Sequence, residues 1–208
     1  MSPPLTLPYA HLNLRRNPFG ELPLDARPAL AVLDPAPYLQ LLAEPRAALL
    51  FLGDKGRGKT THLLTLRATR SGTYVHLPEE GPLPTVPIGL PLLYLDECQR
   101  LRRRHRRRLF RGAGALVIGS HEDHSSELRA AGRVVTRVEV GGLLTIERLG
   151  LIVERRIEAA RRGPGSVPEV SPSSLEALVA RFGDDVRGIE HHLYERFQAL
   201  KEPCDVQV

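Results

Sequence analysis

The chain has 208 residues, of which 42% are hydrophobic and 25% are charged. These values are ordinary for one compact domain with a small accessory domain, and they exclude wholesale disorder, a collagen-like repeat and a disulfide scaffold. No stretch approaches the roughly 18 consecutive apolar residues of a membrane span, and residues 1–16 lack the apolar core of a signal peptide. Because the two cysteines, Cys98 and Cys204, fit a reduced compartment, we expect a cytoplasmic protein without membrane contact.

The formal net charge of +5 is a local property of the chain. Eight arginines lie between Arg100 and Arg111, whereas the whole chain has only three lysines. The remainder of the sequence is therefore mildly acidic, and the basic character belongs to one segment.

The N-terminal residues 1–44 are rich in proline, which fixes φ and removes a backbone donor. This composition predicts an arm of loops with short helices at 25–33 and 37–43.

From Ala47 onward, short apolar runs alternate with helical segments. The runs cover residues 47–52, 73–77, 92–95, 115–118 and 134–140. Runs of this length are typical of strands buried on both faces of a parallel sheet. Helical segments are expected at 59–70, 99–111 and 122–131, so residues 45–142 are predicted to form an α/β domain with a parallel five-stranded sheet.

After Gly141 the apolar residues recur at helical spacing, which predicts three helices in a C-terminal domain over residues 143–208. Thr145 is a predicted N-cap, and so is Ser171, which precedes a proline at the first helical position. Gly163 and Gly183 are placed where glycines follow helix C-termini.

Residues 53–60 match the pattern G-x-x-x-x-G-K-[ST] in full, between a predicted buried strand and a predicted helix. The glycines let the loop curl so that its amides point at an anion, and the helix adds the positive end of its dipole. Lys59 can reach the β and γ phosphates, and the Thr60 hydroxyl can coordinate Mg²⁺. The predicted nucleotide-binding loop consists of Gly53, Asp54, Lys55, Gly56, Arg57, Gly58, Lys59, Thr60 and Thr61.

Two carboxylates, Asp96 and Glu97, stand at the tip of the apolar run that begins at Leu92. Asp96 is predicted to hold the Mg²⁺ shell of a nucleotide. Glu97, one position on, is predicted to polarise the water that attacks the γ-phosphate. Alone this pattern also fits a strand that ends in solvated acids, but after a phosphate loop it becomes a strong pair.

Together these motifs resemble those of the AAA+ ATPases, over most of residues 45–200. The resemblance implies a P-loop NTPase three-layer sandwich with a C-terminal three-helix lid. It also implies ATP and Mg²⁺ as ligands, and a homo-oligomer whose assembly depends on nucleotide.

The resemblance further assigns roles to single residues. Ser120 or His121, at the end of the fourth predicted strand, would be the first sensor of the γ-phosphate. Arg187, in Gly183-Asp184-Asp185-Val186-Arg187, would be the second sensor, from the lid. Pro18 and Phe19 resemble a segment that lines the adenine pocket in AAA+ ATPases of the transposition and secretion type.

The finger arginine that such an assembly needs is not fixed by the sequence. Arg129 and Arg133 are both available near the end of the fourth helix, and Arg137 is a third candidate. Residues 78–90, between the second and third predicted strands, are rich in proline and are not expected to form a helix. AAA+ machines that thread polymers usually have a helix and a pore loop in this region, so its loss argues against a threading role.

The arginines at 100–111 follow the acidic strand end directly. As one helix, the segment would place Leu101, His105 and Leu109 on one face. A solvated helix face is the plain interpretation, but so many like charges favour an external polyanion or an acidic partner protein. We predict contact with the backbone of DNA or RNA through Arg102, Arg103, Arg106 and Arg107.

Three functions remain open on the sequence. The first is an ATPase that acts as a nucleotide-dependent switch coupled to nucleic acid or a partner protein. The second is a nucleotide-dependent nucleic-acid-binding adaptor with negligible turnover. The third, a small-molecule kinase, is disfavoured because Asp96 and Glu97 suit water activation better.

Overall fold

The structure is a computed structural model that describes residues 8–142 and 144–208, which form two compact units. The α/β unit comprises residues 27–141, and the helical unit combines residues 8–26 with the described residues from Gly142 onward. The predicted domain limits at residues 44 and 142 stay a prediction. Residues 1–7 of the predicted arm, and Leu143 at the start of the predicted lid, lie outside the described residues.

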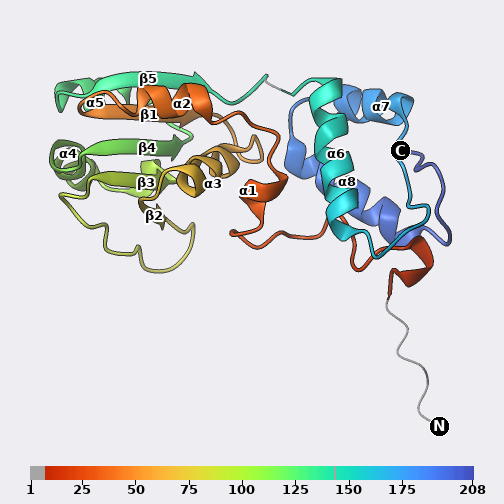
Figure 1. The fold of residues 1–208 in the computed structure, drawn as a ribbon. Helices are drawn as coiled ribbons and strands as arrows, with labels where there is room; N and C mark the ends of the chain where they lie inside the picture. Colours follow the sequence, from red (N-terminus) through yellow and green to blue (C-terminus); the bar gives the residue numbers. More distant parts are fainter. Residues whose placement is uncertain (1–7, 143) are drawn as a thin grey trace, which may run out of the picture. The chain divides into compact units, whose positions relative to one another are not determined.

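The α/β unit is built on a parallel sheet (Figure 1), whose strands run in the order β2-β3-β4-β1-β5. The five strands of residues 27–141 are β1 (Ala47–Leu52), β2 (Thr73–His76), β3 (Leu92–Asp96), β4 (Ala115–Ser120) and β5 (Val134–Glu139). The prediction of a parallel five-stranded sheet is confirmed, and each strand ends within two residues of its predicted limits.

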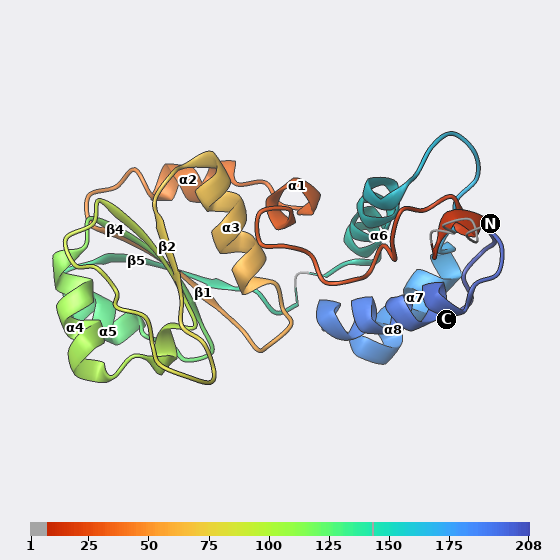
Figure 2. The same ribbon diagram turned by 90° about the horizontal axis from the view of Figure 1, so that it is seen from below.

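Helices cover both faces of this sheet, as Figure 2 shows: α2 and α3 lie on one side of the strands, and α4 and α5 lie on the other. Side chains that alternate along β1 explain the arrangement, because Leu49 and Phe51 join one core cluster whereas Ala48 and Leu50 join the other. The three-layer sandwich is thus confirmed. The helices of this unit are α1 (Arg27–Leu30), α2 (Ala36–Leu41), α3 (Lys59–Thr69), α4 (Arg103–Gly112) and α5 (Ser125–Ala130).

The strand order brings three strand ends together. Because β4 pairs with both β1 and β3, the carboxyl end of each of these strands lies at the same edge of the sheet. Leu52 pairs with Ser120, and Asp96 pairs with Gly119. In open α/β sheets, ligands bind outside this edge.

The arginine segment starts its helix later than predicted. A 3₁₀ turn, η2 (Cys98–Arg100), is followed by extended backbone at Leu101 and Arg102, and α4 begins at Arg103. This break shifts the helical register, so His105 is exposed and the predicted face through Leu101, His105 and Leu109 is wrong. The buried side chains of α4 belong to Leu109 and Phe110.

The helical unit contains α6 (Ile146–Ala160), α7 (Pro172–Phe182) and α8 (Val186–Ala199). The predicted N-caps are confirmed: the Thr145 hydroxyl accepts the Arg148 N–H, and the Ser171 hydroxyl accepts the Ser174 N–H. Gly183 ends α7 as predicted, with a φ of 59°. Gly163 does not end a helix, because α6 already stops at Ala160. None of the described helices is long and apolar enough to cross a membrane.

The N-terminal segment also includes η1 (Ala10–Leu12), and it belongs to the core of the helical unit. The ring of Phe19 meets that of Phe197 edge to face at 5.0 Å between centroids. The Asn17 side chain donates to the Tyr194 carbonyl at 2.9 Å and accepts the Phe19 N–H at 3.0 Å. One buried amide thus ties the segment to α8.

The Asn17→Ala substitution is expected to lower the free energy of unfolding of the helical unit by about 2 kcal/mol, because it removes the partner of one carbonyl and of one buried N–H. Urea unfolding followed by circular dichroism measures the change. Arg16→Ala, one residue earlier and exposed, is the control. Equal stability of the two variants would contradict the role of the amide.

Candidate functional site

The glycine-rich loop connects β1 to α3 at the ligand-binding edge of the sheet. Gly56 and Gly58 have φ of 89° and 92°, which side chains rarely tolerate. Lys59, the first residue of α3, is buried, and its Nζ donates to the carbonyls of Gly53 at 2.7 Å and Asp54 at 2.8 Å. The loop therefore curls around the lysine ammonium. Thr60 and Thr61 follow on the first turn of α3.

Asp96 joins the loop to the sheet. This fully buried carboxylate accepts, at Oδ2, the Thr60 hydroxyl at 2.7 Å and the Tyr74 hydroxyl at 3.0 Å. The His76 ring nitrogen Nδ1 lies 3.4 Å from the same oxygen. Tyr74 and His76 come from β2, which pairs with β3.

These contacts set the protonation of the group. Burial alone would raise the pKa of the Asp96 carboxyl, but the hydrogen bonds from His76, Thr60 and Tyr74 outweigh it and hold that pKa below its ordinary value. Burial, and then the Asp96 charge, raise the pKa of Tyr74. The hydrogen bond to Asp96 raises the pKa of His76. At neutral pH the carboxylate is ionised and Tyr74 is a neutral donor.

The residues at this edge fit a magnesium ion. The second oxygen of Asp96, Oδ1, is buried and has no hydrogen-bond partner among the described residues. Gly119 leaves room for it, because a Cβ there would stand 2.6 Å from that oxygen. Carboxylate and hydroxyl oxygens are the ligands that Mg²⁺ prefers. Within residues 8–142 and 144–208 no cluster of three or more His, Cys, Asp or Glu side chains could hold a metal ion, at this edge or elsewhere, so the protein ligands of the ion would be limited to Asp96 and Thr60.

Glu97 adopts left-handed backbone, with a φ of 64°. This conformation costs roughly 1–2 kcal/mol for a residue other than glycine, and such strain concentrates at functional sites. Three neighbours hold its carboxylate: Gln99 Nε2 at 2.7 Å, an Arg100 guanidinium nitrogen at 3.3 Å and His121 Nε2 at 3.5 Å.

The end of β4 joins the same network. The buried Ser120 hydroxyl donates to Gln99 Oε1 at 3.1 Å and accepts the Glu122 N–H. The His121 ring stands between the two predicted catalytic groups, because its Nε2 lies 3.5 Å from Lys59 Nζ and 3.5 Å from a Glu97 oxygen. Of the two candidate sensors, His121 has the more direct contacts.

Four residues of this network were missed in the sequence. Tyr74 and His76 alternate along β2, which is a pattern for one face of a strand, but the sequence does not say which strand lies beside β3. Gln99 and Arg100 follow Glu97 directly, yet their turn is 3₁₀ and not the predicted α-helix. Only the strand order and the local turn bring these side chains to the carboxylates.

The remaining predicted nucleotide contacts belong to the helical unit. Arg187 is exposed on the first turn of α8, which Asp185 caps through the Gly188 N–H. Pro18 is buried, and Phe19 lies in the core of that unit.

The candidate finger arginines have contrasting environments. The Arg133 guanidinium is buried and donates to the carbonyls of Phe110, Ala113 and Gly114 at the end of α4. Burial lowers the pKa of Arg133 to about 10, so the group is still charged at neutral pH. These bonds use Arg133 inside its own unit and argue against it as a finger.

Two other candidates are exposed. Arg129 stands on α5, and Arg137 on β5 forms ion pairs with Glu139 and Asp123. Arg129 is therefore the better placed of the two for a neighbouring subunit.

The four arginines predicted to contact nucleic acid also differ in their environments. Arg106 is 11% exposed and forms a bidentate pair with Glu127, at 2.9 and 3.2 Å, while it also donates to the Leu101 carbonyl. The hydrogen bond to Glu127 raises the pKa of Arg106 and lowers that of Glu127. Arg106 thus has a structural role, whereas Arg102, Arg103 and Arg107 are exposed.

A comparison of structures relates this fold to a known one. It is similar to the Holliday junction branch migration motor RuvB of Thermotoga maritima, with a TM-score of 0.53 and 19% sequence identity. The match covers 83% of this chain but only 60% of the RuvB chain. This likeness and the sheet order β2-β3-β4-β1-β5 show that the chain has the fold of AAA+ domains. No family model and no curated protein matches the sequence.

The Arg133→Met substitution is expected to lower the free energy of unfolding by about 3 kcal/mol, because it leaves three carbonyls without their donors. Arg129→Met removes the same charge from an exposed site and is expected to change it by less than about 0.5 kcal/mol. Urea unfolding followed by circular dichroism compares the two variants. A loss of stability in Arg129→Met but not in Arg133→Met would contradict the interior role of Arg133.

Proposed function

We propose that the chain is an AAA+-type ATPase that hydrolyses ATP with Mg²⁺ and acts as a nucleotide-dependent switch. The observation that carries the proposal is the 2.7 Å hydrogen bond between Thr60 and Asp96, which joins the phosphate loop to the acidic strand end. The fold of AAA+ domains supports nucleotide binding at this edge of the sheet.

The loop residues 53–60 bind the phosphates through their amides, with Lys59 as the cation. When nucleotide binds, the Lys59 ammonium gives up its hydrogen bonds to the carbonyls of Gly53 and Asp54. It then donates to oxygens of the β and γ phosphates. Thr60 and Asp96 hold the magnesium ion. When bound, this ion neutralises charge that develops on the phosphates.

Glu97 orients and deprotonates the attacking water, since it is the carboxylate next to Asp96 that has no metal to hold. His121 and Ser120 sense the γ-phosphate from the end of β4. Arg187 acts from the helical unit, and Arg129 acts on the nucleotide of a neighbouring subunit. The proposal therefore includes a homo-oligomer that forms with nucleotide.

Arg100 provides a physical route for coupling. Its guanidinium lies 3.3 Å from Glu97 and 3.5 Å from Glu79, which in turn pairs with Lys55 of the phosphate loop. Arg100 is also the first residue of the arginine segment, residues 100–111. A polyanion on this segment competes with Glu97 for the guanidinium, and the carboxylate is then released for water activation.

The adaptor without turnover is the second candidate, and one observation favours it. Glu97 is held by Gln99, Arg100 and His121 together, which is a restrained state for a general base. Sedimentation with ATP, beside a phosphate-release assay, separates the two functions, because an adaptor assembles without releasing phosphate.

The ATPase proposal predicts that Lys59→Ala and Glu97→Gln lower the rate of phosphate release. The loss of the general base is expected to reduce kcat by about 10²–10⁴-fold, whereas Lys59→Ala also weakens nucleotide binding. Lys201→Ala, an exposed lysine of the helical unit, is the matched control. Equal turnover in all four proteins, including the unaltered chain, would refute the enzymatic function.

The coupling route predicts that Arg100→Gln raises basal ATP hydrolysis. Partly exposed ion pairs contribute about 0–1 kcal/mol, so the increase is expected to be at most about fivefold. The rate with added duplex DNA is expected to change little beyond this, because the restraint is already gone. Arg70→Gln, exposed at the end of α3, removes the same charge elsewhere. An unchanged basal rate in Arg100→Gln would contradict the route.

A further inference from the structure

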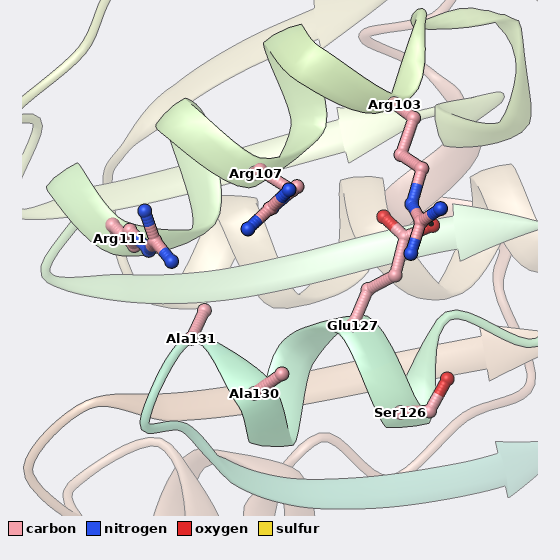
Figure 3. A pocket seen from close by; sticks show the side chains of 7 residues that line it. All are labelled: Arg103, Arg107, Arg111, Ser126, Glu127, Ala130 and Ala131. Atoms are coloured by element: carbon pink, nitrogen blue, oxygen red, sulfur yellow. Dashed lines mark ion pairs between the residues drawn. The ribbon is translucent and has the colours of Figure 1, made fainter.

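A groove of about 330 Å³ lies between α4 and α5. This volume far exceeds the roughly 10–15 Å³ that one water molecule needs by the same measure, so the groove has room for a row of polar groups. Figure 3 shows Arg103, Arg107 and Arg111 pointing from α4 toward α5. The facing wall carries only small side chains, those of Ser126, Ala130 and Ala131, beside Glu127.

Most of the charge in this groove is uncompensated. Among the described residues, Arg107 and Arg111 form no ion pair, and both are exposed. Arg103 approaches Glu127 only to 3.9 Å, and that carboxylate is already bonded by Arg106. Like charges four residues apart destabilise a helix by roughly 0.2–0.5 kcal/mol per pair. An anion in the groove would relieve this repulsion.

The far end of the groove is also prepared for an anion. The last carbonyls of a helix carry partial negative charge, which repels anions at that end. Here the buried Arg133 donates to the carbonyls of Phe110, Ala113 and Gly114, close in sequence to Arg111. This guanidinium offsets the partial negative charge at the end of α4. An anion can therefore approach Arg111 without repulsion from these carbonyls.

The geometry points to the phosphate backbone of a nucleic-acid duplex as the ligand of this groove. Arg103, Arg107 and Arg111 follow one another at about 6 Å along the helix axis and span about 12 Å. One strand of a duplex carries one charge per about 3.4 Å of the duplex axis, hence roughly three or four phosphates over that length of axis. Guanidinium forks pair with phosphate oxygens in a bidentate manner.

The lining residues disfavour other occupants. The hot spots of protein interfaces lie in well-packed, fully desolvated pockets, whereas the arginines of this groove are exposed and face alanine, serine and one glutamate. A flexible single strand gains affinity by stacking its bases on aromatic rings, and none of the described residues that line the groove is aromatic. A duplex, by contrast, holds its phosphates in order before it binds.

The role of this groove rests on the proposed function, in which a polyanion on the arginine segment activates hydrolysis. Binding itself needs no hydrolysis. A binding assay without nucleotide therefore tests the groove separately from the ATPase proposal.

The experiment measures binding of a labelled 30-base-pair DNA duplex by fluorescence anisotropy, with the full chain and at several salt concentrations. The Arg107→Ser/Arg111→Ser variant is expected to bind about tenfold or more weakly, with a salt slope reduced by about 2. The matched control is Arg104→Ser/Arg108→Ser, which removes the same charge from exposed positions of α4 outside the groove. Its affinity is expected to fall by less than about threefold. Circular dichroism verifies that both variants are folded.

Further probes decide the class of ligand. Poly-glutamate and a single-stranded oligothymidine are titrated at the same salt concentration, and each is expected to bind more weakly than the duplex. Equal losses of duplex affinity in the two double variants, or no loss in Arg107→Ser/Arg111→Ser, would overturn the proposal that the groove binds the duplex. Tighter binding of poly-glutamate or of the single strand would overturn the duplex assignment.

Discussion

The hydrogen bond from the Thr60 hydroxyl to the Asp96 carboxylate is the contact on which the candidate site depends, because it joins the glycine-rich loop to the carboxyl edge of the sheet. A fully buried carboxylate is costly unless donors surround it, and here the donors come from two elements, Thr60 of α3 and Tyr74 and His76 of β2. The bond therefore fixes the phosphate-loop helix against β3. Asp96 keeps its second oxygen, Oδ1, outside these hydrogen bonds, so the two residues that stabilise this edge, Thr60 and Asp96, are also the ones expected to bind the metal.

One residue type, arginine, meets very different demands within residues 100–137. Arg133 satisfies carbonyls in the interior, and Arg106 is paired with Glu127. Arg100 is shared between two carboxylates. All of these groups are charged, but the arginines that face away from such partners are the ones available to an external ligand. Net charge counts all of these equally, because burial and pairing arise from the fold and not from composition.

The sequence predicted the order of strands and helices well because apolar run length and the phosphate-loop pattern are local signals. It also predicted the caps at Thr145 and Ser171, which depend on bonds three residues apart. It failed where the result depended on non-local pairing. The contact of Tyr74 with Asp96 requires β2 to lie beside β3, and the register of α4 depends on a turn after Glu97. The spacing of apolar residues along the chain does not reveal which strand lies beside which, nor where a 3₁₀ turn interrupts a helix.

The link between the two proposed ligands has a thermodynamic consequence. If a duplex on the arginine segment draws Arg100 away from Glu97, then duplex and nucleotide each change the state of one carboxylate. Coupling of binding free energies is reciprocal, so the nucleotide must alter duplex affinity by the same factor. The ion pairs at Arg100 are partly exposed, and such pairs contribute about 0–1 kcal/mol. The coupling through this route alone is then limited to about fivefold. A larger effect requires that nucleotide also change the assembly, because several subunits would then present their grooves to one duplex and combine their modest affinities.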